Sequence, residues 1–442
     1  MSDMDDPARR AAFIHEQLPE GGLFAGHEWR MATEPFKLGK ELADELEKLG
    51  RILLKFYRSA DLLYRQSVSG KQPGWVSDWL DIGKPAELVS NQRNSFFKTD
   101  LPAVIRPDIL LTEQGWVITE LDSVPGGMGL TAWLNRTYTE CAGDVIGGRD
   151  GMTDGFAGIF GNANNVHVVV SEESGTYRPE MEWLCSILGE RFVVRDSSFT
   201  KWNKGDAVYR FFELFDLSNV KNSGEIIKAA MSGNLLLTPP PKSYLEEKML
   251  LALLWNRNLR DFWRRELGGA FHRRLLEHTP QSWVVNPEPL PPHAAIPGLD
   301  LTDWRQLAGM SQRERNLVLK VSGFSDRAWG ARGLHIGSDL SGDDWTKAVD
   351  RALSEFSLSP WVLQRYHKPR RLSQGWFDFK TNEEKVMDGR VRLCPYYFVT
   401  GEGGAATAQL GGVLATVCPA NKKVIHGMPE AVLAPCAVVN DD

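Results

Sequence analysis

The 442-residue sequence contains few cysteines and no long apolar run. Its five cysteines are scattered, odd in number and free of Cys-x-x-Cys spacing, so they indicate neither a disulfide framework nor a thiolate zinc site. No apolar run approaches the length of a membrane span. The acidic start, residues 1–6, lacks the basic and apolar regions of a secretory signal. These absences predict a cytoplasmic protein with no membrane partner.

Positive charge is not in excess either. The formal net charge of -6 gives no electrostatic reason to expect nucleic acid as the main partner. No Gly-x-Ser-x-Gly elbow occurs and no Cys/His arrangement stands out, so serine and cysteine hydrolases are not indicated. A chain with 42% hydrophobic and 24% charged residues is typical of globular proteins, and its length predicts two or three structural units.

The most informative segment is a predicted β-hairpin built around a three-residue loop at 113–115. Its register places Asp108 opposite Glu120 and Arg106 opposite Asp122, with all four side chains on one face. Like charges directly opposite one another destabilise a hairpin unless positive charge lies between them. Mg²⁺ bound by the three carboxylates would supply that charge. A solvated rim with an Arg–Asp ion pair is an equal alternative.

A glycine turn follows this hairpin. Gly126 and Gly127 lead into a predicted helix that runs to Tyr138. Backbone N–H groups at a helix start favour anions, so a phosphate or carboxylate is expected there. The commoner alternative is that the glycines simply make a sharp turn.

Alternating strand and helix patterns over residues 166–238 predict a parallel sheet in a small Rossmann-like domain without the dinucleotide fingerprint. Upstream, apolar residues at helical spacing predict a scaffold helix over about 36–66. Downstream, residues 287–297 form a proline-rich connector. An apolar strand that contains Lys320 comes next, and a loop with four glycines at 323–337 follows it.

The C-terminal part adds three further patterns. An amphipathic helix is predicted over 343–356, followed by a strand at 361–366. A strand that contains Arg390 and Arg392 and a further strand at 410–415 are also predicted. The two arginines are two residues apart and therefore point to the same face of their strand.

These motifs together resemble the ATP-grasp ligases, specifically the circularly permuted branch related to glutathionylspermidine synthase. Conventional members run lysine strand, glycine loop, hinge strand, arginine strand and then an acidic strand pair of the form D…E-x-N. Here the acidic pair, Asp108…Glu120-x-Asp122, comes first. The resemblance covers most of residues 100–430.

The resemblance implies an α/β (α+β) fold, a circularly permuted ATP-grasp fold with a Rossmann-like pre-ATP-grasp domain. The expected ranges are a helical region at 1–100, the acidic hairpin and following helix at 101–160, the Rossmann-like domain at 161–285, and the remaining ATP-grasp strands at 286–442.

The resemblance also implies ATP and Mg²⁺ as cofactors. Asp108, Glu120 and Asp122 would hold the metal. Arg392 and Arg106 would neutralise charge on the transferring phosphoryl group, and Arg390 competes with Arg392 for that role. The expected ATP-binding residues are Lys320, Gly323, Gly330, Gly333, Gln364, Arg365 and Tyr366. The substrate acyl group is expected near Gly126 and Gly127.

Two departures from the family pattern stand out. Asp122 replaces the usual asparagine of the metal strand, which adds charge but keeps an oxygen ligand. The family also has a second nucleotide lysine upstream of the lysine strand, yet no lysine occurs between Lys248 and Lys320. Arg305 is the candidate substitute.

The implied activity is that of an ATP-dependent carboxylate–amine ligase that forms an acyl phosphate and releases ADP and phosphate. A small-molecule kinase and a non-catalytic nucleotide-binding protein are the alternatives. The expected partners are a small-molecule carboxylate and an amine, whose identities the sequence leaves open. Oligomeric state is also open, with a homodimer as one alternative.

Overall fold

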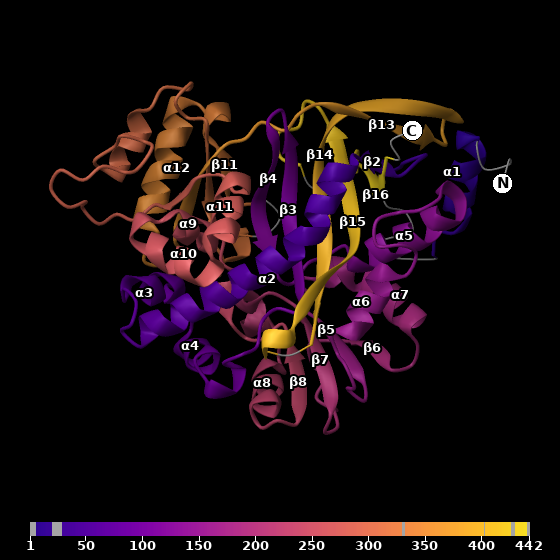
Figure 1. Cartoon of the computed structure of the whole chain (residues 1–442), viewed down its shortest axis with the longest axis horizontal. Coiled ribbons are helices and arrows are strands. Elements are labelled where there is room, and N and C mark those ends of the chain that lie inside the picture. Colours follow the sequence, from indigo (N-terminus) through magenta and orange to yellow (C-terminus); the bar gives the residue numbers. More distant parts are fainter. Residues whose placement is uncertain (1–5, 20–28, 329–331, 402, 426–428, 440–442) are drawn as a thin grey trace. The chain divides into compact units, whose positions relative to one another are not determined.

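A computed structural model describes residues 6–19, 29–328, 332–401, 403–425 and 429–439 (Figure 1). The chain divides into two compact units, each assembled from separate segments. Unit 1 comprises Met1–Lys55, Phe96–Pro240 and Pro369–Asp442, and unit 2 comprises Phe56–Ser95 and Pro241–Lys368. The fold is mixed α/β, and the division does not follow the four predicted ranges.

Unit 1 contains an eight-stranded sheet in the order β1-β16-β15-β14-β3-β4, with β13 paired to β14 and β2 paired to β16. Its strands are β1 (Arg30–Met31), β2 (Phe36–Leu38), β3 (Val104–Thr112), β4 (Gly115–Asp122), β13 (Leu372–Asp378), β14 (Glu383–Thr400), β15 (Thr407–Pro419) and β16 (Val432–Val438). Strands β15, β14 and β3 lie side by side in Figure 1. The predicted acidic hairpin and the predicted arginine strand are therefore neighbours, although they are far apart in sequence.

The predicted hairpin is confirmed, but its loop is shorter than expected. Thr112 pairs with Gly115, which leaves two loop residues instead of three. A register shift between Asp108 and Ile109 makes Thr119 an extra residue on β4 and restores the expected register beyond it. Asp108 therefore does pair with Glu120, and the other predicted pair is also present.

A second sheet of unit 1 is four-stranded and parallel, in the order β6-β5-β7-β8. Its strands are β5 (Val166–Val170), β6 (Phe192–Arg195), β7 (Asp206–Phe211) and β8 (Leu235–Thr238). The predicted parallel sheet is thus confirmed. Val169, Val208 and Leu237 pack with Ile226 of helix α8 (Ser223–Met231) in its core. Parallel strands end at one edge, which is where ligands bind in open α/β sheets.

The helices of unit 1 are α1 (Pro7–Glu16), α5 (Met128–Ala142), α6 (Gly151–Gly158), α7 (Arg178–Leu188) and α8 (Ser223–Met231). The predicted scaffold helix is α2 (Lys40–Val68), which contributes to both units because the boundary falls after Lys55. Its leucine stripe is buried, as the amphipathic pattern predicted.

Unit 2 contains a four-stranded antiparallel sheet in the order β11-β10-β12-β9. Its strands are β9 (Ser282–Val284), β10 (Leu317–Val321), β11 (Leu334–Ile336) and β12 (Trp361–Arg365), and its helices are α3 (Trp75–Asp81), α4 (Ala86–Gln92), α9 (Met249–Trp255), α10 (Arg260–Leu267), α11 (Gly269–His278) and α12 (Gly342–Ser354). Trp345 and Trp361 lie in its core. In the described parts of the chain, no helix has the length and apolar character to cross a membrane.

Candidate functional site

The acidic hairpin and the arginine strand meet at Asp108. Arg392 Nη1 of β14 lies 3.0 Å from Asp108 Oδ2, and Arg106 Nη2 of β3 lies 3.2 Å from Asp108 Oδ1. Arg106 Nη2 also lies 3.0 Å from Asp122 Oδ2 on β4. We call Arg106, Asp108, Asp122 and Arg392 the Asp108 cluster. Asp108 is buried, the other three side chains are partly buried, and all four residues lie in unit 1.

Arg390 shares the face of Arg392 but takes a different partner. Arg390 Nη1 donates to the carbonyl oxygen of Lys422 at 3.1 Å, whereas Arg392 donates to Asp108. The pairing of β14 with β3 therefore selects Arg392, and not Arg390, as the neighbour of the acidic strand.

The charges of the cluster depend on one another. Burial acts to raise the pKa of Asp108, but Arg106 and Arg392 outweigh it, so this pKa lies below its ordinary value. Burial raises the pKa of Asp122, and its single arginine partner compensates only in part. Burial also acts to lower the pKa of Arg106, which Asp108 and Asp122 instead raise. Asp108 is therefore an ionised carboxylate held between two cations.

The three carboxylates predicted to bind magnesium are not arranged around a cation position. Among the described residues, no group of three or more His, Cys, Asp and Glu side chains has a metal-binding arrangement. Asp108 and Asp122 both face Arg106, and Asp122 Oδ1 also accepts from the backbone N–H of Val124 at 2.9 Å. The alternative prediction, an Arg–Asp ion pair, describes this arrangement. As placed, these residues do not fit a magnesium ion.

At the start of α5, where the sequence predicts a bound phosphate or carboxylate, the structure places a carboxyl group of the chain itself. Glu180 of α7 accepts from the N–H of Gly127 at 2.7 Å and of Leu130 at 3.0 Å. Burial raises the pKa of Glu180 to about 7, against these N–H donors. The carbonyl oxygen of Gly126 accepts from Arg106 Nη1 at 3.1 Å and Tyr396 Oη at 2.8 Å. Glu180, Arg106 and Tyr396 thus hold the glycine turn in place through hydrogen bonds.

In unit 2, the predicted lysine and hinge strands are direct neighbours. Lys320 on β10 and Gln364 on β12 are both buried, and Lys320 Nζ donates to Gln364 Oε1 at 3.2 Å. Gln364 Nε2 in turn donates to Ser282 Oγ on β9 at 3.1 Å.

The glycine loop is described on both sides of Gly330, which itself lies outside the described residues. A Cβ at Gly323 would lie 2.6 Å from the carboxyl group of Glu247, and one at Gly333 would lie 2.8 Å from the carbonyl oxygen of Arg327. Close packing therefore requires these two glycines whether or not the loop binds phosphate. Glu247 is held by Lys84 Nζ at 2.5 Å and by Ser322 Oγ.

The remaining predicted ATP contacts have local partners. The Arg365 guanidinium lies 5.6 Å from the ring centroid of Trp283, and the N–H of Tyr366 donates to the carbonyl oxygen of Asn316 at 3.1 Å. Arg305, the candidate substitute for the missing lysine, is 65% exposed and pairs with Asp303 at 3.1 Å. The geometry gives Arg305 a surface ion pair in place of a nucleotide contact.

Sequence reasoning missed the residues that position these groups: Glu180, Tyr396, Lys84 and Glu247. Each was an isolated polar residue with no spacing that marks a site. Glu180, in the first turn of a helix, has the usual place of a solvated glutamate. No feature of the neighbouring sequence would have distinguished Glu180 from such a solvated glutamate.

No protein-family model matches this chain, and no curated protein matches its sequence. Among solved structures, it is similar to a glutathione synthetase-like effector from Globodera pallida in its apo form. That match has a TM-score of 0.57 at 13% identity and covers 98% of each chain. A Methylobacillus flagellatus structure named for gamma-glutamylcysteine synthetase has a TM-score of 0.36 at 12% identity, covering 85% of this chain and 84% of that one. The first match shows that this chain shares the fold of a glutathione synthetase-like protein.

Proposed function

We propose that the protein is an ATP-dependent carboxylate–amine ligase with the motif order of a circularly permuted ATP-grasp enzyme. In this reaction the substrate carboxylate attacks the γ-phosphate of ATP, an acyl phosphate forms with release of ADP, and an amine then displaces phosphate. The reaction needs no protein nucleophile, because positioning and positive charge provide most of the catalysis.

The ion pair between Arg392 and Asp108 carries this proposal. These residues are 284 positions apart in the sequence, yet they form a partly buried contact from adjacent strands. Burying two guanidinium groups is costly, and it is expected where charge on a phosphoryl group must be neutralised. The Nε atoms of Arg106 and Arg392 are both buried and have no hydrogen-bond partner in the described structure. The cluster thus keeps donor capacity that its own carboxylates do not use.

Unit 2 supplies the residues proposed for the nucleotide. Lys320 would pair with phosphate, and the backbone of the strand that carries Gln364 would meet adenine. Both side chains are fixed by hydrogen bonds before any ligand binds, which reduces the entropy lost on binding. Magnesium would enter with the phosphates as Mg-ATP. The chain itself would hold no metal, because Asp108 and Asp122 are paired with arginine.

A phosphate-release screen of amino-acid and polyamine pairs with Mg-ATP tests the proposal. We expect at least one carboxylate–amine pair to release ADP and phosphate in equal amounts with formation of an amide. Release of AMP and pyrophosphate, or of phosphate without an amide, would contradict it.

The two arginines of β14 provide a matched control. Arg392→Gln should lower phosphate release by about 10²-fold or more, because it removes a cation from the developing charge. Arg390→Gln, on the same face of the same strand, should retain most of the activity. Thermal melting of both variants separates loss of activity from loss of folding. Equal activity losses in two folded variants would count against a phosphoryl-binding role for Arg392.

The arrangement of the Asp108 cluster also favours a second candidate, a nucleotide-binding protein without ligase activity. Its carboxylates do not form a metal site among the described residues, and the upstream lysine of the family is missing. In that case Mg-ATP should raise the melting temperature and Lys320→Gln should abolish the rise, while no substrate pair releases phosphate.

A further inference from the structure

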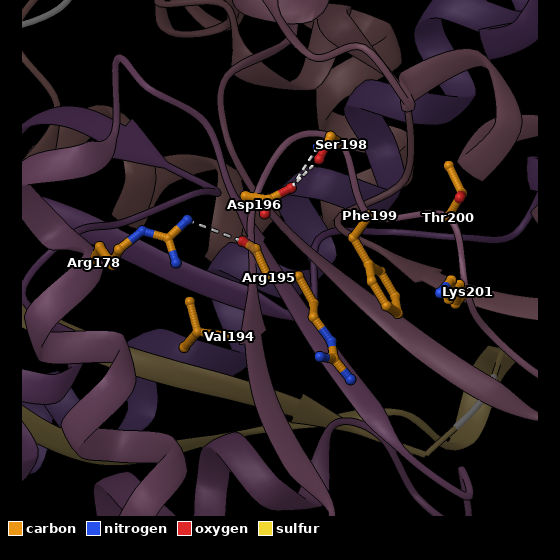
Figure 2. A pocket seen from close by; sticks show the side chains of 8 residues that line it. All are labelled: Arg178, Val194, Arg195, Asp196, Ser198, Phe199, Thr200 and Lys201. Atoms are coloured by element: carbon orange, nitrogen blue, oxygen red, sulfur yellow. Dashed lines mark hydrogen bonds between the residues drawn. The ribbon is translucent and has the colours of Figure 1, made fainter.

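A hollow of about 430 Å³ lies at the carboxyl end of β6 in unit 1 (Figure 2). Its lining comes from the first residue of α7, the last two residues of β6 and the loop that follows β6. Ligands of open α/β sheets bind outside the carboxyl ends of the strands, so the position is that of a binding site. None of the lining residues belongs to the Asp108 cluster or to the residues proposed for ATP.

The hollow has a net positive lining. Arg178, Arg195 and Lys201 contribute three positive charges, and Asp196 contributes one negative charge. Asp196 Oδ1 accepts from the N–H of Ser198 at 2.8 Å and from its hydroxyl at 2.5 Å, and these bonds lower the pKa of Asp196. Asp196 is therefore ionised at neutral pH. The remaining positive charge favours an anionic ligand such as a phosphomonoester, which carries about -1.5 to -2 at pH 7.

Arg195 is held in one orientation. Its Nε donates to His167 Nδ1 at 3.3 Å, and its guanidinium lies 4.3 Å from the ring centroid of Phe199. Figure 2 shows these two lining side chains, Arg195 and Phe199, next to each other. The terminal nitrogens of Arg195 have no hydrogen-bond partner among the described residues. A guanidinium that is oriented through Nε and the ring keeps its two outer nitrogens for a ligand.

The tautomer of His167 makes this orientation possible. His167 Nε2 lies 3.2 Å from Asp206 Oδ2, and a carboxylate can only accept, so Nε2 carries the hydrogen. Nδ1 is then free to accept from Arg195. Burial lowers the pKa of His167, so the ring is neutral at pH 7.

Arg178 reaches the same strand end from α7. Its Nη2 donates to the carbonyl oxygen of Arg195 at 3.2 Å (Figure 2). Its Nη1 lies 3.6 Å from Glu182. Val194 and Phe199 add apolar surface. The volume exceeds what a bare phosphate ion needs and lies within the range of small-molecule sites, about 300–1,000 Å³. The lining thus suits a phosphate group attached to an organic body.

We propose that this hollow binds a phosphomonoester, with the phosphate at Arg195 and Lys201 and the organic part against Phe199. The proposal does not depend on ligase activity. No bond is made or broken at this site.

Titration of the full chain with D-ribose 5-phosphate tests the proposal, with D-ribose as the probe that lacks the phosphate. We expect backbone amide NMR signals of residues 194–201 to shift with D-ribose 5-phosphate and not with D-ribose. The proposal is overturned if these signals do not move, or if both sugars move them equally. Shifts confined to the residues around Lys320 would also overturn it, because they would place the phosphate at the proposed nucleotide site.

Three variants test the charges. Lys201→Glu should weaken D-ribose 5-phosphate binding by about tenfold or more, since it reverses a charge in the lining. Lys204→Glu changes an exposed lysine three residues away that is not part of the lining, and should alter binding by less than about twofold. Asp196→Asn should tighten binding by about threefold, since it removes the only negative charge of the lining.

Both lysines are exposed, so these substitutions should leave the melting temperature nearly unchanged. Equal weakening by Lys201→Glu and Lys204→Glu would show a general charge effect and would end the proposal. So would weaker binding in Asp196→Asn, because a lining carboxylate opposes a phosphate. If a variant does not fold, the NMR shifts of the native chain decide.

Discussion

At the scale of single residues, the central feature is a carboxylate whose charge depends on two buried cations. Asp108 is ionised because Arg106 and Arg392 compensate the cost of its burial, and they are charged for the same reason. Such a cluster stabilises the fold only as long as it is complete. The same dependence makes Asp108 a poor residue for testing ligand binding, since its loss also disturbs both arginines.

Asp108→Asn should therefore lower the free energy of unfolding by about 3–5 kcal/mol, because it leaves two buried guanidinium groups without their shared counter-charge. Urea unfolding measures the loss. The control is Asp388→Asn on β14, whose carboxylate is 60% exposed and lies 3.6 Å from Arg371. That change should cost less than about 1 kcal/mol. Similar losses in the two variants would show that the Asp108 cluster is not a coupled group.

Glu180 makes the stability of the protein depend on pH. Its pKa in the folded protein is about 7 because of burial, against an ordinary value of 4.5. Between these values the folded state holds a proton that the unfolded chain has released, so the free energy of unfolding falls as pH rises from about 4.5 to 7. The contribution is on the order of 3 kcal/mol, since a tenfold change in proton affinity is about 1.4 kcal/mol.

Glu180→Gln removes this titration, so the difference in stability between the variant and the native chain should change with pH across this window. Urea unfolding at several pH values measures it. Parallel curves for the two proteins from pH 4.5 to 7 would show that Glu180 does not titrate there.

At the scale of elements, α5 and α7 pack closely because Gly129 of α5 has no side chain. A Cβ at Gly129 would lie 2.2 Å from the carbonyl oxygen of Glu180 on α7. This contact places the Glu180 carboxylate at the start of α5, where it accepts from the N–H groups of the glycine turn. The turn therefore owes its geometry to a helix that follows it in sequence by about fifty residues.

Gly129→Ala should destabilise the protein by about 1–3 kcal/mol, because the added methyl group has no room between the helices. Gly224→Ala is the matched control, since Gly224 also lies in a helix, α8, and a Cβ added there would have no atom within 4 Å. It should stabilise the protein by about 0.5–1 kcal/mol through lower chain entropy. Thermal melting distinguishes the two signs, and a shift in the same direction for both would contradict the packing argument.

At the scale of the whole molecule, the two units are assembled from separate parts of the chain. Unit 2 combines residues 56–95 with residues 241–368, and a buried ion pair between Lys84 and Glu247 joins the two segments. Both side chains are nearly inaccessible, with 1% and 2% exposure. Unit 2 is thus a single compact body made of two stretches far apart in sequence.

Lys84→Met should destabilise the protein by about 3–5 kcal/mol, because Glu247 is left buried without its cation. Adding Glu247→Gln should restore at least half of that loss, since the second change removes the uncompensated charge. Lys347→Met, at an exposed ion pair with Asp344, is the control and should have little effect. A double variant less stable than Lys84→Met alone would contradict this account.

Local pattern was sufficient to predict most of the secondary structure. The hairpin at 104–122, the parallel sheet of 166–238 and the lysine and hinge strands are all present. Periodicity reports which residues are buried along one element, and this depends on neighbours in sequence. The predicted loop of the hairpin was one residue too long. A bulge at Thr119 cannot be recognised from the alternation of apolar and polar residues before the pairing with the partner strand is known.

What the sequence alone determined was the type of each element and the charged residues that stand out in it. The tertiary structure decided which of them meet. Whether Arg390 or Arg392 reaches Asp108 depends on the register of two strands that are nearly three hundred residues apart. The carboxyl group at the start of α5 is that of Glu180 because α7 packs there, and Asp108 and Asp122 pair with arginine because burial requires compensation of their charge. Long-range pairing and burial set these partnerships, and neither is encoded in spacing along the chain.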